Sequence, residues 1–204
     1  MKIISIAHQK GGVGKTTLTL NLAAFFAKGL NVAVLDTDRQ GSLKGLQSNT
    51  EGITFVSFDG QLQSLSNLPN LSFDLLIIDT PPYLTELLPD LFAISDFVLV
   101  PSKVGFLDVM AIRATLELLK QAQQQRPQLK YGVVMNMVKP RTRMNKMVQD
   151  LLIDYQVPLF ETTISDRVSY SMSVIKSGIF ALDDEKAIEE ITALANEILN
   201  ALGL

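Results

Sequence analysis

The sequence has no cysteine and only one histidine, His8. Without cysteine there can be no disulfide, no Cys-ligated zinc and no thiol catalysis, and a single histidine disfavours a His-based metal site. No apolar run approaches the roughly 20 residues that a membrane-spanning helix needs. The N-terminus has one lysine, a short apolar run and then glycines, which is typical of neither a signal peptide nor a transit peptide. We therefore expect a cytoplasmic protein.

The chain of 204 residues is 47% hydrophobic, which suits one compact domain covering residues 1–204.

The net charge of the chain is low, but the charged residues are unevenly distributed. Its formal net charge of −3 by itself disfavours a nucleic-acid partner. The segment from Arg126 to Lys176, however, contains 8 basic and 4 acidic residues. This basic segment is the part of the chain to consider for an anionic partner.

Apolar segments alternate with segments of helical periodicity. This alternation predicts an α/β fold with a mostly parallel central sheet and helices on both faces. In such sheets ligands bind beyond the carboxyl ends of the strands, so the polar residues that follow each strand are candidate site residues. The segment 41–70 is weakly patterned, and its elements cannot be ordered from the sequence. We expect strands at 2–7, 31–35, 73–78, 96–100 and 129–135, and helices at 15–28, 107–125, 146–155 and 183–202.

A glycine-rich turn follows the first expected strand. Its glycines let successive backbone N–H groups point inward as an anion cradle, and the helix that follows directs its positive end to the same place. Lys15 supplies a charge for the β- and γ-phosphates, Thr16 offers a hydroxyl to Mg²⁺, and Thr17 can bond a phosphate. The alternative is a glycine turn with an incidental lysine. The predicted ATP-binding residues are Gly11, Gly12, Val13, Gly14, Lys15, Thr16 and Thr17.

The ordinary phosphate-loop pattern has a glycine where this chain has Gln9, and Lys10 follows it. The resulting K-G-G-x-G-K-T-T resembles the deviant Walker A motif of the ParA/MinD family of P-loop ATPases. The resemblance implies that Lys10 reaches the phosphates of a partner subunit in an ATP-dependent homodimer. Electrostatics agrees, because Lys15 already serves the loop's own nucleotide. The alternative is a solvent-facing Lys10.

Carboxylates follow two of the expected strands. Asp36 and Asp38 lie in a segment that resembles the family's D-x-D-P-Q switch, with Arg39 in place of proline. The resemblance implies that Asp38 positions the hydrolytic water and that Asp36 supports the Mg²⁺ shell; the alternative is a helix cap or turn. Asp79 ends an apolar strand in a segment that resembles the family's I-D-x-P-P, which implies a Walker B residue that binds Mg²⁺ through water. A buried structural aspartate is the alternative there.

Two further sets of residues have weaker signals. Asn136 follows the fifth strand, where its amide can pair with the edge of adenine, although turn and capping positions also favour asparagine. Family resemblance implies that basic residues in the C-terminal part bind DNA without sequence preference; the alternatives are a solvated surface or a role toward the nucleotide. The predicted DNA-binding residues are Lys139, Arg141, Arg143, Lys146, Arg167 and Lys176.

The resemblance is to short ParA-type proteins without an N-terminal helix-turn-helix domain. It implies an ATPase that is stimulated by a ParB-like or small DNA-binding adaptor, associates with the nucleoid, and positions a plasmid, a chromosome region or a protein compartment. The last expected helix has no basic residue after Lys186, so we expect no membrane binding. Two alternatives are a MinD-type membrane or polar switch and a metabolic enzyme related to dethiobiotin synthetase. We interpret His8 as a packing residue rather than a catalytic base, and Asp183 to Glu185 as the first turn of the last helix.

Overall fold

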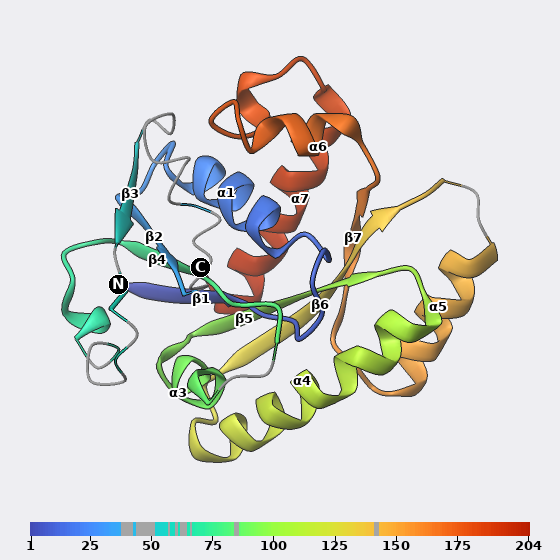
Figure 1. Ribbon diagram of the computed structural model, residues 1–204, viewed down its shortest axis with the longest axis horizontal. Helices are drawn as coiled ribbons and strands as arrows, with labels where there is room; N and C mark the ends of the chain where they lie inside the picture. The colour runs from blue at the N-terminus through green and yellow to red at the C-terminus, as the bar shows by residue number, and fades with distance from the viewer. Residues whose placement is uncertain are drawn as a thin grey trace.

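The computed structural model describes residues 1–37, 43, 52–56, 58–59, 61, 65, 67–83, 86–140 and 143–204. The described part contains seven strands in one sheet, in the order β3-β2-β4-β1-β5-β6-β7, and these neighbours pair in parallel (Figure 1). The strands are β1 (Lys2–Ile6), β2 (Val32–Asp36), β3 (Ile53–Val56), β4 (Leu75–Asp79), β5 (Phe97–Lys103), β6 (Lys130–Val138) and β7 (Leu159–Ser165). The helices are α1 (Lys15–Phe26), α3 (Leu87–Ile94), α4 (Phe106–Gln125), α5 (Arg143–Asp154), α6 (Val168–Ser173) and α7 (Glu185–Leu202), with short 3₁₀ turns at Leu68–Asn70 and Ile179–Ala181.

Helices cover both faces of the sheet, as the sequence predicts. Successive strand residues alternate between the two faces, so Ile3 packs into one core and Ile4 into the other. The first core contains residues of α3, α4 and α5, and the second contains residues of α1, α6 and α7 (Figure 1). This double covering explains why the central strands are continuously apolar.

The five expected strands and four expected helices are all present, with ends that differ by a few residues. Four described elements were not predicted: β3, β7, α3 and α6. The edge strand β7 contains Glu161, Thr162 and Thr163 and is mostly half-buried, so it lacks the continuous apolar run of a central strand. In α3, Pro89 lies in the first turn, where a helix loses no backbone hydrogen bond to proline.

The sheet brings two of the predicted carboxylates, Asp36 and Asp79, together at the carboxyl ends of neighbouring strands. Asp36 is in register with Asp79, and Asp79 is in register with Ile6, at the end of the strand that leads into the glycine-rich turn. The three strand ends therefore meet beside that turn. None of the helices in the described part of the chain combines the length and the hydropathy that a membrane-spanning helix requires.

Candidate nucleotide site

The glycine-rich turn forms a cradle between β1 and α1. Gly12 and Gly14 have φ values of 68° and 91°, in the left-handed region that favours glycine, and Gly14 is the N-cap of α1. A cavity of about 300 Å³ opens above the turn. Its lining includes Gly11, Gly12, Gly14, Lys15, Thr16 and Thr17 together with Thr80, Pro82 and Met137. Six of the seven predicted ATP-binding residues thus line one cavity, and the seventh, Val13, is fully buried.

Lys15 is the first residue of α1 and is 6% exposed. Its ammonium donates to the carbonyl oxygen of Lys10 across the turn, at 3.3 Å. This contact places a cation inside the cradle, at the positive end of the helix. Both features favour a multiply charged anion in the cavity.

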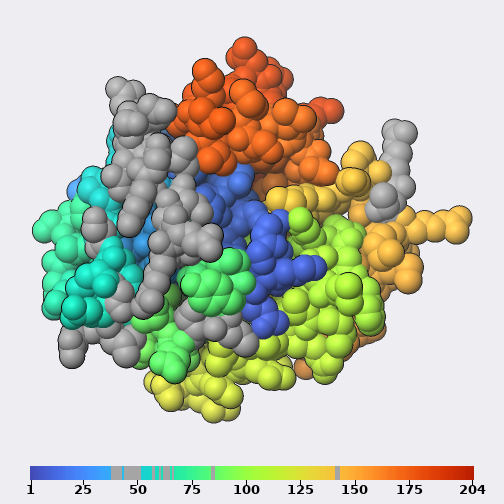
Figure 2. Space-filling view, in the orientation of Figure 1, coloured from blue at the N-terminus to red at the C-terminus, as the bar shows by residue number. Residues whose placement is uncertain are grey.

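Lys10 lies on the other side of the turn and faces α4. Its Nζ is 2.5 Å from Oδ1 of Asp108, in the first turn of α4. Gln9, which replaces the usual glycine, donates from Nε2 to the carbonyl oxygen of Ala111, also on α4. The turn, blue in Figure 2, reaches the surface beside the green N-terminal part of α4. Neither Asp108 nor these two contacts could be found from the sequence, because they join residues about a hundred positions apart.

His8 is buried just after β1, and its Nδ1 accepts a hydrogen bond from the backbone N–H of Lys10 at 2.8 Å. Burial, and then the charge of Lys15, lower the pKa of His8 to about 4. The imidazole is therefore neutral near pH 7. This arrangement agrees with the interpretation of His8 as a packing residue.

The residues predicted to hold Mg²⁺ come together at the strand ends. The hydroxyl of Thr16 donates to Oδ2 of Asp79 at 2.6 Å, and Asp79 is 2% exposed. The donor set of a hydroxyl and a buried carboxylate beside an anion cradle fits Mg²⁺, which prefers oxygen ligands and water. Bound there, Mg²⁺ would neutralise phosphate charge. Asp36 neighbours Asp79 and accepts a hydrogen bond from the N–H of Leu43 at 3.0 Å, whereas Asp38 and Arg39 lie outside the described residues.

Asn136 is buried against the phosphate turn. Its Nδ2 donates to the carbonyl oxygen of Val13 at 2.7 Å, and its Oδ1 accepts from the N–H of Met137 at 2.9 Å. Asn136 therefore stabilises the conformation of the phosphate turn. Its pairing with adenine stays a prediction. A second, smaller cavity of about 60 Å³ opens at this point.

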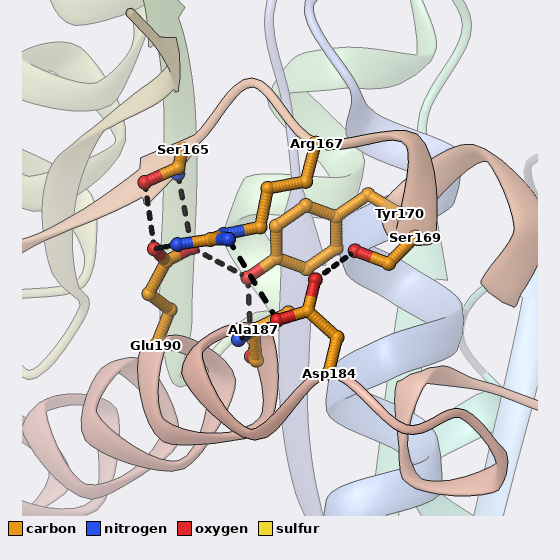
Figure 3. Close-up of polar contacts among 7 residues, drawn as sticks. All are labelled: Ser165, Arg167, Ser169, Tyr170, Asp184, Ala187 and Glu190. Atoms are coloured by element: carbon orange, nitrogen blue, oxygen red, sulfur yellow. Dashed lines mark hydrogen bonds and ion pairs between the residues drawn. The ribbon is translucent and has the colours of Figure 1, made fainter. Parts of the chain in front are cut away.

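The predicted DNA-binding residues lie on three segments of the chain. Lys139, Arg143 and Lys146 lie at the end of β6 and the start of α5, and Arg141 lies outside the described residues. Lys176 is exposed after α6. Arg167 differs from these residues because its guanidinium contacts two carboxylates, those of Glu190 and Asp184 (Figure 3). The N–H of Asp166 donates to the carbonyl oxygen of Val138 at 3.0 Å, so Arg167 and Lys139 directly follow two hydrogen-bonded residues at the ends of β7 and β6.

A parallel sheet with a glycine-rich phosphate cradle at its carboxyl edge, a buried lysine and an adjacent hydroxyl–carboxylate pair defines a P-loop nucleotide-binding protein. Residues 4–178 match the family described as the CobQ/CobB/MinD/ParA nucleotide binding domain. This chain belongs to that family, the ParA/MinD group of P-loop ATPases.

Similarity to known proteins, in sequence and in fold, is consistent with this assignment. The chain is 29% identical over 208 residues to the maintenance of carboxysome distribution protein A of Halothiobacillus neapolitanus, and the match covers 96% of this chain and 95% of that protein. Its fold is similar to that of apo McdA from Cyanothece, with a TM-score of 0.82 at 20% identity, covering 98% of this chain and 99% of that one.

A second similar structure contains ligands. Cobyrinic acid a,c-diamide synthase of Mycobacterium smegmatis, with bound ADP and magnesium, matches with a TM-score of 0.75 at 23% identity, covering 97% of this chain and 94% of that one. Nucleotide and magnesium thus occur in a solved structure of this fold.

Proposed function

We propose that this chain is a ParA-type ATPase that binds Mg²⁺-ATP in the phosphate cradle, forms a homodimer around the nucleotide, and positions a cargo on DNA. One observation carries the proposal: the chain has two lysines at one phosphate turn, and they face different ways. Lys15 points into its own cradle, while Lys10 is held on the α4 side. A second cation at this turn has an electrostatic use if it serves the nucleotide of another subunit.

The proposed hydrolysis uses the predicted residues. Lys15 and the N–H groups of residues 11–17 would hold the phosphates, while Thr16 would bind Mg²⁺ and Asp79 would bind it through water, with support from Asp36. Asp38 orients the attacking water, and Lys10 of the partner subunit stabilises the charge that develops on the γ-phosphate. Phosphoryl transfer of this type depends on positioning and electrostatics, which agrees with the neutral, buried His8.

DNA binding is proposed for the basic residues at the end of β6 and the start of α5, with Lys176. Lysine and arginine neutralise phosphates and release counterions, so this binding does not depend on sequence and falls steeply with salt. Dimer formation doubles the number of phosphates that can be neutralised. Arg167 is the weakest member of the predicted set, because Glu190 and Asp184 offset its charge.

The partner and the cargo are proposed from the similarity of this chain to known ParA-type proteins. A small DNA-binding or ParB-like adaptor would stimulate hydrolysis and release the dimer from DNA. The match along nearly the whole chain to a protein of carboxysome distribution favours a cargo that is distributed within the cell, such as a protein compartment, a plasmid or a chromosome region.

Dimer formation is tested by size-exclusion chromatography with light scattering in ATP and in ADP. We expect a dimer in ATP only, its loss in Lys10→Ala, and its retention in Lys120→Ala, which removes an exposed lysine of α4. A parent chain that stays monomeric in Mg²⁺-ATP, or a Lys10→Ala dimer as tight as the parent's, contradicts the proposal.

DNA binding is tested by fluorescence anisotropy with ATP over a range of salt. We expect Lys139→Glu and Lys146→Glu each to weaken binding and to lower the salt slope by about one unit for each phosphate that is no longer neutralised. The control is Lys130→Glu, at the opposite end of β6. If all three variants bind DNA equally, the assignment of this surface is wrong.

A further inference from the structure

The second cavity lies directly beside the phosphate cradle. It shares Thr17 and Met137 with the first cavity, so the two open side by side. Its far wall is formed by the end of β7 and the residues that follow, with Ser165, Arg167 and Tyr170 among them. Leu18 and Ile164 add apolar surface. A flat aromatic base suits this lining, because its faces are apolar and its edges are polar.

One carboxylate, that of Glu190 on α7, holds this wall (Figure 3). Its Oε1 accepts from the Ser165 hydroxyl at 2.6 Å and from the Arg167 guanidinium at 3.3 Å. Its Oε2 accepts from the Ser165 N–H at 3.0 Å and from the Tyr170 hydroxyl at 2.8 Å. Glu190 thus bonds to three residues of the wall but is not itself part of the lining.

A second carboxylate ties the same segment to the start of α7. Asp184, the N-cap of α7, accepts from the Ala187 N–H at 3.1 Å and from the Ser169 hydroxyl at 2.6 Å. Its Oδ1 also lies 3.7 Å from the Arg167 guanidinium. Burial and the neighbouring Glu190 raise the pKa of the Tyr170 phenol, so Tyr170 remains a neutral donor in this network.

The wall lies at the edge of the sheet rather than in its centre. It continues from the edge strand β7, which pairs with β6 through a shifted register. The Ser165 N–H donates to Glu190 rather than to another strand. The N–H of Asp166 ties the start of the wall to Val138 of β6 at 3.0 Å, and Glu190 ties Ser165, Arg167 and Tyr170 to α7, so the place of these three residues depends on where α7 holds Glu190.

We propose that Glu190 is a positioning residue for the nucleotide base: by fixing Ser165, Arg167 and Tyr170, it sets the width of the base cavity. This inference rests on the proposed function, because it needs a nucleotide in the phosphate cradle. It assigns Arg167 to the nucleotide site. A purine base is the ligand class, and its binding energy, unlike that of the phosphates, depends on Glu190.

The chain offers a matched control on the same helix. Glu197 lies two turns further along α7 and accepts the N–H groups of Glu161 at 3.0 Å and Thr162 at 2.7 Å, also on β7. Neither Glu161 nor Thr162 lines the second cavity. Glu190→Gln and Glu197→Gln therefore make the same chemical change in two glutamates that both bond to β7, but only Glu190→Gln disturbs the wall of the second cavity. Glutamine offers an NH₂ group where the partners need an acceptor.

The experiment is calorimetric titration of the full chain with ATP and with inorganic tripolyphosphate, both with Mg²⁺. We expect Glu190→Gln to bind ATP about three- to tenfold more weakly and tripolyphosphate as the parent does, and Glu197→Gln to leave both affinities unchanged. Tyr170→Phe, which removes only the phenol hydroxyl, gives a smaller loss in the same direction and serves if Glu190→Gln does not fold.

Three results would overturn the inference. In the first, Glu190→Gln binds ATP as tightly as the parent. In the second, its affinities for ATP and tripolyphosphate fall together. In the third, Glu197→Gln loses as much ATP affinity as Glu190→Gln. A parent chain that binds no Mg²⁺-ATP would instead contradict the proposed function, so the two failures are distinguishable.

Discussion

Lys10 and Asp108 form an ion pair within one chain, with Nζ 2.5 Å from Oδ1. The lysine proposed to serve the partner's nucleotide is therefore held by a carboxylate of its own α4. To reach another subunit, Lys10 must exchange this carboxylate for a phosphate. The pair thus opposes dimer formation, and its removal should favour the dimer.

We predict that Asp108→Asn strengthens the ATP-dependent dimer about two- to fivefold. The Lys10 side chain is 43% exposed, so solvent screens the pair, and an ion pair of this kind is worth about 0.2–1 kcal/mol. Sedimentation velocity over a concentration series measures the dimer dissociation constant. Asp90→Asn, which alters an acidic residue in the first turn of α3, is the control. A weaker dimer in Asp108→Asn than in Asp90→Asn would show that Asp108 assists association.

Gly14→Ala should abolish nucleotide binding and lower the free energy of unfolding by about 1–3 kcal/mol. The φ of Gly14 is 91°, and an added Cβ would collide with Nδ2 of Asn136, which is held by the Val13 carbonyl. Gly29→Ala is the matched control, because no atom of the described residues lies within 4 Å of a Cβ placed there. Urea denaturation and ATP titration of both variants check the prediction. Equal effects at the two glycines would mean that the turn tolerates a side chain.

Asp79→Asn should remove most of the gain in ATP affinity that Mg²⁺ provides. Losing a carboxylate next to a metal typically costs about 10- to 100-fold in metal affinity, and Asp79 is the buried acceptor for the Thr16 hydroxyl. ATP titrations with Mg²⁺ and with EDTA give the two affinities. Asp74→Asn alters the carboxylate just before the opposite end of β4 and should keep the full Mg²⁺ effect. The prediction is wrong if the two variants respond to Mg²⁺ alike.

The buried His8 should make the protein less stable as the pH falls from 6.5 toward 4. Its pKa is lowered to about 4 in the folded chain, so over this interval the unfolded chain binds a proton that the folded chain does not. Between pH 7 and pH 5 this difference costs about 2 kcal/mol. His8→Asn keeps an acceptor for the Lys10 N–H and does not titrate, so its urea midpoint should fall less over the same interval. An equal fall in both chains would show that other groups cause it.

The sequence alone identified the parts of the site that are local. The glycines, Lys15 and Thr16 follow one another along the chain, and their geometry depends mainly on φ values that glycine permits. Asp36 and Asp79 were located because apolar strands precede them and because parallel strands end at one edge. In each case the signal lies within a few residues.

Contacts between distant segments had no such signal. Asp108 looks like any acidic residue in the first turn of a helix, and Glu190 looks like any glutamate of an amphipathic helix. Arg167 was assigned to DNA because its charge is visible in the sequence, whereas the carboxylates that pair with it are not adjacent to it. The β7 strand was missed because an edge strand needs no continuous apolar run.

By itself, then, the sequence determined the phosphate turn, the alternation of strands and helices and the family, because backbone preference and hydrophobic periodicity act over short stretches of chain. Only the tertiary structure decided which carboxylate holds Lys10 and which one holds the wall of the second cavity. Those choices depend on how α4 and α7 pack against the sheet, and packing joins residues whose separation along the chain has no regular period.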